Sequence, residues 1–240
     1  MSTKEEIRYK IWKLLEDKNI ARFPRPVFNR IPNFVGAEEA AEKLAELDIF
    51  KKSKVIKVNP DSPQARVREL VLLNNKILIM PTPRIREGFL LLDPSKIPKN
   101  EISYAATIKG AFKYGNKVHP RNLPNIDLIV LGAVAVSLEG ARIGKGEGYG
   151  ELEFAILQEY GKINKDIKIA TTVHDIQIVE KIPIEPFDVS IDYIVTPTRV
   201  IEIKNRHDRP KGILWEYLSH EKIEEIPLLK ELRNKLISQK

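Results

Sequence analysis

The chain of 240 residues contains no cysteine, which excludes disulfide bonds, thiolate metal sites and cysteine nucleophiles. No apolar run approaches the roughly 18 to 20 residues that a membrane-spanning helix requires. The first ten residues, MSTKEEIRYK, are charged and lack the apolar stretch of a signal peptide. We therefore expect a cytoplasmic protein without a membrane segment.

Two common nucleotide-binding motifs are also missing. A P-loop needs Gly-Lys followed by Ser or Thr, but Gly144-Lys145 is followed by Gly146. A dinucleotide fingerprint needs G-x-G-x-x-G, and the place of its third glycine falls on Tyr149. A nucleotide site in this chain would have to be of another kind.

The composition is that of a globular protein, with 42% hydrophobic and 30% charged residues. The length allows one good-sized core or two small ones. A net charge of +7 suits polyanionic ligands such as nucleotides, polyglutamate tails or RNA, and it is equally compatible with a solvated basic surface.

Helix-like and strand-like apolar patterns alternate along the chain. This alternation predicts an α/β protein, a three-layer Rossmann-like fold whose largely parallel sheet has helices on both faces. The expected helices cover 3–18, 36–47, 62–75, 149–161, 212–225 and a segment after Pro227. The expected strands cover 54–58, 76–81, 127–137, 167–173 and one or two segments within 192–203.

Other segments have no regular pattern. Three prolines within 22–35 predict an ordered, extended connector, and prolines and lysines interrupt any periodicity in 82–125. The helices near the end of the chain read as an appendage. We expect a domain over 1–205 and a C-terminal helical extension over 206–240 packed on it.

The stretch GARIGKGEGYGELEFAIL, residues 140–157, places alternating glycines between a buried strand and a helix. Open N–H groups at a helix N-terminus attract anions, and glycines let the backbone approach a phosphate closely. Arg142 and Lys145 add positive charge, and the arginine fork matches phosphate oxygens. The loop predicts a phosphate site, with a flexible strand-to-helix turn as the alternative.

Several stretches carry a family resemblance. RIGKGEGY followed by an acid resembles the signature of the 5-formyltetrahydrofolate cyclo-ligase (methenyltetrahydrofolate synthetase) family, approximately R-L-G-x-G-x-G-Y-Y-D. KEEIR resembles the family's opening K-x-x-x-R, and PIEPFDVSIDYIVTPTRVI resembles its closing segment. The resemblance covers nearly all of residues 4–203.

Within this family, FPRPVFNRIPNFVGAEEAA, VNPDSPQ and HDIQIV are similar to the branch of methenyltetrahydrofolate synthetase domain-containing proteins. The longer animal members of that branch add an RNA-recognition domain, which we do not expect in this chain.

The resemblance implies an ATP- and Mg²⁺-dependent ligase that converts 5-formyltetrahydrofolate, or a related formylated pterin, to 5,10-methenyltetrahydrofolate. The formyl oxygen would take the γ-phosphoryl group of ATP, N10 would close the ring, and ADP and phosphate would leave. Such chemistry relies on positioning and charge stabilisation more than on a protein nucleophile.

The resemblance also implies roles for individual residues. Arg142, Lys145 and Tyr149 match catalytic positions, and Glu151 and Asp188 match the two magnesium carboxylates. Glu151 is one methylene longer than the aspartate of the family. The implied nucleotide contacts are Lys4, Arg8, Arg142, Gly144, Lys145, Gly146, Gly148 and Tyr149.

Each assignment has a structural alternative. Lys4 and Arg8 lie four residues apart, as a solvated pair on one helix face also would. Tyr149 could be a core residue, Glu151 a carboxylate at a helix dipole, and Asp188 a turn former. His174 beside Asp175 could orient a substrate or shuttle a proton, or form structural hydrogen bonds.

Two positions depart from the family pattern. Gly150 stands where the family has a second tyrosine. The pterin-contacting glutamate has Pro63 near its place, with Asp61 or Glu69 as candidates to replace it. A second hypothesis therefore stays open, a non-catalytic nucleotide- or RNA-binding protein that retains the loop, although no RNA-recognition signature or aromatic stacking platform is visible.

Overall fold

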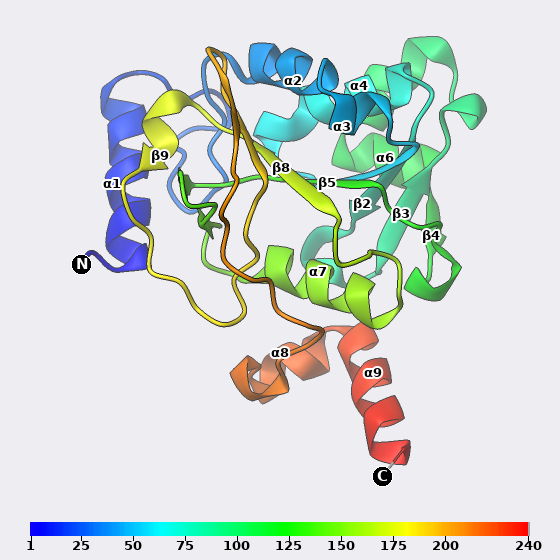
Figure 1. Ribbon diagram of the computed structural model, residues 1–240. Helices are drawn as coiled ribbons and strands as arrows, with labels where there is room; N and C mark the ends of the chain where they lie inside the picture. Colours follow the sequence, from blue (N-terminus) through cyan, green and yellow to red (C-terminus); the bar gives the residue numbers. More distant parts are fainter. Residues whose placement is uncertain (240) are drawn as a thin grey trace.

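A computed structural model describes residues 1–239, and Figure 1 shows a central sheet with helices on both faces. The strand order is β11-β10-β8-β5-β1-β2-β3-β4. Five neighbouring strands run parallel: β1 Val55–Val58, β2 Ile77–Pro81, β5 Leu128–Leu131, β8 Lys168–Thr172 and β10 Tyr193–Val195. Three antiparallel strands complete the two edges: β3 Phe89–Leu92, β4 Asn116–Val118 and β11 Val200–Glu202.

The central strands form because their short apolar runs are covered on both faces. All four residues of β1 and all four of β5 are buried, which is typical of parallel strands between helix layers. A smaller second sheet stands beside them and is formed by β6 Ala135–Ser137, β7 Arg142–Ile143 and β9 Ile178–Val179.

The helices form separate layers (Figure 1). One face of the large sheet packs against the helices α2 Ala37–Ala45, α3 Asp48–Lys51, α4 Ala65–Leu73, α5 Ile102–Ala105 and α6 Ile108–Tyr114. The other face packs against α7 Tyr149–Glu159, with α8 His220–Glu225 and α9 Pro227–Ser238 continuing the same apolar core. The predicted three-layer α/β fold with a largely parallel sheet is thus confirmed.

The first helix, α1 Lys4–Asp17, belongs to neither of these layers. It lies beside the small sheet, with Ile7, Ile11 and Leu15 buried against residues of the connector and β6. Thr3 and Glu6 form a capping box at its start. The expected connector over 22–35 has no helix or strand, and a bridge between Ala21 and Phe34 closes it.

The prediction of one strand over 127–137 was wrong. The segment divides at Gly132 into β5 of the large sheet and β6 of the small one. A Cβ atom at Gly132 would lie 2.6 Å from Ile31 Cγ2 and 2.7 Å from Gln64 Oε1. The chain therefore leaves the sheet at the one residue that tolerates this close approach, and no apolar pattern reveals that bend.

Several other elements differ from those expected from the sequence. The segment 82–125 contains β3, β4, α5 and α6, which pattern alone did not detect. The helix expected over 36–47 is α2, which ends at Ala45, and the separate short helix α3 begins at Asp48. The helix expected over 212–225 is reduced to a 3₁₀ turn and α8. The 3₁₀ turns are η1 Ser62–Gln64, η2 Pro83–Ile85, η3 Pro94–Lys96, η4 Lys99–Glu101, η5 Pro120–Asn122, η6 Asp175–Gln177 and η7 Trp215–Tyr217.

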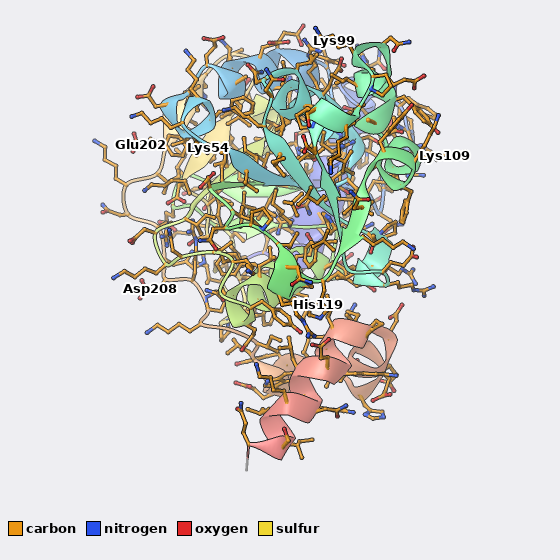
Figure 2. All side chains as sticks on the ribbon, turned by 90° about the vertical axis from the view of Figure 1, so that its right-hand side faces the viewer. Lys54, Lys99, Lys109, His119, Glu202 and Asp208 are labelled. Atoms are coloured by element: carbon orange, nitrogen blue, oxygen red, sulfur yellow. The ribbon has the colours of Figure 1, made fainter. Side chains whose placement is uncertain are left out.

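The last two helices lie below α7, and Figure 2 shows His119 at their junction with the body of the protein. His119 Nε2 is 2.8 Å from Glu231 Oε2 of α9, and Arg121 Nη2 is 2.6 Å from Glu231 Oε1. The division into 1–205 and 206–240 stays a prediction. Across residues 1–239, none of the helices combines the length and apolarity needed to span a membrane.

Candidate functional site

The glycine loop, residues 144–148, connects β7 to α7. Gly146 has φ +108° and Gly148, the residue before α7, has φ +76°, conformations that L side chains rarely adopt. No side chain within the described chain caps this helix start. The first N–H groups of α7 are therefore available to an anion.

The N-terminal helix supplies two cations to this loop. Arg8 Nε donates to the carbonyl oxygen of Gly144 at 2.8 Å, and Lys4 Nζ lies 2.5 Å from Asp188 Oδ2. The side chains of Lys4 and Arg8 are only 18% and 13% exposed. Such exposures do not fit a solvated surface pair, and they hold two positive charges at the loop.

Arg142 is fixed beneath the loop. Its Nε donates to the carbonyl oxygen of Gly132 at 2.7 Å, and its Nη1 donates to Glu151 Oε1 at 2.9 Å. A Cβ atom at Gly150 would lie 3.3 Å from Nη2 of this guanidinium. This close approach gives a physical reason for the departure from the family pattern at Gly150, because a side chain there would press on Arg142.

A cavity of about 300 Å³ lies where β1 and β2 end, and we call it the strand-end cavity. Asp61, which follows β1, and Thr82, which follows β2, line it together with Lys145 and Tyr149 from the loop side. The carboxyl ends of parallel strands are where α/β folds bind their ligands.

A second cavity, of about 280 Å³, touches the glycine loop as well, and we call it the loop cavity. It shares Arg142, Gly144, Gly148 and Glu151 with the strand-end cavity. The sequence-predicted residues that line it are Lys4, Arg8, Arg142, Gly144, Gly146, Gly148, Glu151 and Asp188. Every residue to which the resemblance assigns a catalytic, nucleotide-binding or metal-binding role therefore lines one cavity or the other, while those roles remain predictions.

Asp61 is the carboxylate at the end of β1 that faces the strand-end cavity. Within residues 1–239, its side chain accepts no hydrogen bond; Arg68 donates to its carbonyl oxygen instead. Burial raises the pKa of Asp61, while Lys145 and Arg68 oppose the rise. Glu69 lies outside the cavity and pairs with Arg66 at 3.1 Å, so Asp61 is the better-placed of the two candidates for the missing glutamate.

Sequence reasoning missed a buried ion pair beneath this cavity. Lys57 of β1 bonds to Glu153 of α7, and its Nζ also donates to Asn59 Oδ1 at 2.9 Å. Burial raises the pKa of Glu153, and the charge of Lys57 opposes that rise. The sequence signal that could have revealed the pair was a lysine inside the apolar strand KVIKV and a glutamate inside the apolar stretch that follows the glycine loop.

One edge of the strand-end cavity has an unusual backbone. Arg84 and Ile85, between β2 and β3, both have φ +54°. This conformation is strained for a non-glycine residue, most of all for the β-branched Ile85. Arg84 lines the cavity, so this strained segment borders it.

The two predicted metal carboxylates lie on the loop cavity. Glu151 pairs with Arg142, and Asp188 pairs with Lys4. Among residues 1–239, no group of three or more His, Cys, Asp or Glu residues could hold a metal ion. Mg²⁺ commonly binds one or two carboxylates together with substrate phosphates. The donor set therefore fits a magnesium–nucleotide complex rather than a self-contained metal centre.

His174 lines neither of these cavities. Its Nδ1 accepts from the backbone N–H of Ile176 at 3.2 Å, and its backbone N–H donates to Gln177 Oε1 at 2.7 Å. These two hydrogen bonds form a capping box at the start of η6. Burial lowers the pKa of His174, with Asp175 opposing. These contacts favour the structural alternative for this histidine.

Known proteins are similar to this chain in sequence. The model of the 5-formyltetrahydrofolate cyclo-ligase family matches residues 1–197. Methenyltetrahydrofolate synthase domain-containing proteins are 43% identical over 236 residues in Danio rerio and 42% in Homo sapiens, each match covering 96% of this chain. The chain spans 62% and 61% of the length of these two curated relatives.

A solved structure agrees with the fold. The 5,10-methenyltetrahydrofolate synthetase of Aquifex aeolicus has a TM-score of 0.52 at 21% identity, covering 90% of this chain and 99% of its own. The resemblance found in the sequence, including that to the domain-containing branch, is confirmed. The chain belongs to the 5-formyltetrahydrofolate cyclo-ligase family.

Proposed function

We propose that the chain is an ATP- and Mg²⁺-dependent ligase that converts 5-formyltetrahydrofolate to 5,10-methenyltetrahydrofolate. One observation carries this proposal: residues from both ends of the family-matched region meet the glycine loop around the loop cavity. Arg8 binds Gly144, and Lys4 pairs with Asp188. The convergence lies beside a cavity at the ends of the parallel strands.

In this proposal the loop cavity takes the phosphates of ATP. Lys4 and Arg8 approach from α1, and the glycines expose the start of α7. Lys145 pairs with Glu147 at 3.3 Å, and its side chain is 37% exposed. Such an exposed pair is weak, so Lys145, which lines the strand-end cavity, can exchange its carboxylate partner at little cost for the γ-phosphate at the wall that the two cavities share.

Glu151 and Asp188 would hold the magnesium ion together with the phosphates. The bound ion would neutralise charge on the transferring phosphoryl group. In the absence of a ligand, the cations of Arg142 and Lys4 compensate these carboxylates.

The strand-end cavity would take the reduced folate. Asp61 would accept hydrogen bonds from N–H groups of the pterin, in place of the family's glutamate. A half-buried carboxylate without a protein donor gains from such a ligand. Tyr149 and the open position at Gly150 would form part of the wall, so a related formylated pterin is a second candidate substrate.

The reaction would take place at the wall that the two cavities share. The formyl oxygen attacks the γ-phosphorus, the bond to the β-phosphate oxygen breaks, and ADP forms. N10 then attacks the activated carbon and loses its proton, and phosphate leaves. Arg142, held by Gly132 and Glu151, is a fixed charge at this wall and would stabilise the transferring group.

An absorbance assay tests this proposal. Purified protein is mixed with Mg-ATP and 5-formyltetrahydrofolate, and the near-ultraviolet band of methenyltetrahydrofolate is followed. We expect growth that requires both ATP and magnesium and is lost in Glu151→Ala. A flat trace from a protein that binds Mg-ATP in calorimetry would reject 5-formyltetrahydrofolate as the substrate. A trace that stays flat with a related formylated pterin as well would favour a non-catalytic nucleotide-binding protein.

A further inference from the structure

A third cavity, of about 230 Å³, lies between α7 and the C-terminal extension, and we call it the extension cavity. Leu152 and Ala155 of α7 form one wall. Ile213 and Tyr217 form the opposite wall, and Phe187 comes from the closing segment.

The extension wall is held in place by hydrogen bonds. Gln158 of α7 donates to the carbonyl oxygen of Pro210 at 3.1 Å and accepts from the N–H of Gly212 at 2.9 Å. The N–H of Ile213 donates to Glu159 Oε1 at 3.0 Å, and Ile213 is buried. Because these hydrogen bonds fix residues 210–213 on α7, the extension cavity is preformed.

Lys222 connects the extension to the glycine loop. Its Nζ donates to the carbonyl oxygen of Glu147 at 3.0 Å and lies 4.0 Å from the centre of the Tyr149 ring. A cation at this distance over an aromatic face is attracted to it. The extension therefore packs on the same loop that is expected to hold phosphate.

The lining of the extension cavity indicates its ligand. Its walls are mainly carbon, and the Phe187 and Tyr217 rings stand 5.4 Å apart at an angle of 64°. It shares Gly146, Gly148, Glu151 and Phe187 with the loop cavity. A molecule that fills both cavities would join a flat apolar group to an anion.

We propose that the extension cavity holds the base of the nucleotide whose phosphates occupy the loop cavity. This inference rests on the proposed function. Residues 210–222 lie beyond the region 1–197 that the family model matches, so this base site would not be common to the family. The relatives that match over 236 residues extend through it.

The benzoyl-glutamate part of a folate is another aromatic group joined to anions, so the same chemistry has two sources. The base is favoured because the aromatic ring of Phe187 lines both the extension cavity and the loop cavity, where the phosphates would lie. The residues shared with the strand-end cavity are Glu147, Gly148 and Glu151, and no aromatic side chain is among them.

Calorimetry on the full chain tests the inference with two probes, Mg-ATP and Mg-tripolyphosphate, which lacks a base. The wild type should bind Mg-ATP at least about tenfold more tightly, a difference of about 1.4 kcal/mol. Tyr217→Ala should remove that difference and leave the tripolyphosphate affinity unchanged. Tyr217 is 50% exposed, so its truncation should not disturb folding, and Leu214→Trp, which fills the cavity, should have the same effect.

Tyr104→Ala is the matched control, because Tyr104 is 41% exposed and lines none of the three cavities. Equal wild-type affinity for both probes, with ring closure intact, would overturn the base site and leave the proposed function standing. Weaker folate binding with unchanged Mg-ATP binding in Tyr217→Ala would reassign the cavity to the folate. Absence of both binding and ring closure would reject the proposed function and this inference together.

Discussion

Two carboxylates at the amino ends of parallel strands, Asp127 and Asp192, differ in their partners from Asp61 at the carboxyl end of β1. At the amino ends, Asp127 accepts from the N–H groups of Lys54 and Val55 at 2.8 and 2.9 Å, and Asp192 accepts from Ile169 at 2.9 Å. At the carboxyl ends, Asp61 accepts nothing within the described part of the chain. The N–H groups at the strand starts need acceptors, and Asp127 and Asp192 accept from them. Asp61 has no such donor and is available to a ligand.

The pKa values of Asp192 and Asp61 shift in opposite directions. Burial alone would raise the pKa of Asp192, but the charge and hydrogen bonds of Arg209 outweigh it and lower the pKa. For Asp61, burial dominates over Lys145 and Arg68, and the pKa is raised. Burial acts on both the structural carboxylate Asp192 and the candidate site carboxylate Asp61. The two differ in whether hydrogen-bond donors of the protein surround the carboxylate.

The largest predicted effect is on stability. Asp192→Asn should cost about 3 to 5 kcal/mol of unfolding free energy, because it leaves the buried guanidinium of Arg209 without its counter-ion. Urea unfolding measures this loss. The control is Asp208→Asn, on the exposed surface shown in Figure 2, and equal midpoints for the two variants would contradict the structural role of Asp192.

Asp61→Asn should have the converse phenotype. We expect kcat/KM for the folate to fall by about 100-fold through lost positioning, while the melting temperature at neutral pH does not fall, because Asn removes a carboxylate that burial disfavours. Steady-state kinetics and thermal unfolding check the two halves. Glu69→Gln is the matched control from the neighbouring helix α4, and an equal loss of activity there would remove the distinction between these carboxylates.

Lys145→Ala should weaken Mg-ATP binding at least about tenfold, about 1.4 kcal/mol, because it removes a charge-assisted phosphate contact. Calorimetry measures the affinity. Lys165→Ala, on the exposed turn after α7, serves as the charge-matched control. An unchanged affinity in Lys145→Ala would exclude this lysine from the phosphate site.

The smallest effect is a pair of pH dependences with opposite signs. The stabilisation by Asp192, whose folded pKa is below the ordinary 3.8, is complete above that value and is lost as pH falls through the folded pKa. Asp61 has a raised folded pKa, so its protonated form stabilises the fold below pH 3.8, and this contribution is lost as pH rises through the folded pKa.

Urea unfolding across acidic pH, with each Asn variant subtracted from the wild type, isolates these two terms. The stability difference should grow with pH for Asp192→Asn and shrink with pH for Asp61→Asn. The same sign for both carboxylates would contradict the comparison between the strand ends.

Much of the fold was predictable because the parallel strands are short apolar runs between amphipathic helices. The bend at Gly132 was not, since it arises from contacts with Ile31 and Gln64, which are distant in sequence. The antiparallel strands β3 and β4 were missed because prolines and lysines surround them.

For the site, motifs gave the loop and its cations, but their partners needed the structure. Lys4 meets Asp188 only because α1 packs beside the small sheet, and Lys57 meets Glu153 only across two layers. The extension cavity arises from the packing of 210–222 on α7, which no motif encodes.

The central claim is that this chain couples ATP cleavage to closure of the folate ring. The most direct test follows phosphate release and methenyltetrahydrofolate absorbance in one sample of the wild type with Mg-ATP and 5-formyltetrahydrofolate. Our account predicts that the two rise together, one phosphate for each ring closed. Phosphate release without ring closure, or neither signal from a protein that binds Mg-ATP, would contradict it.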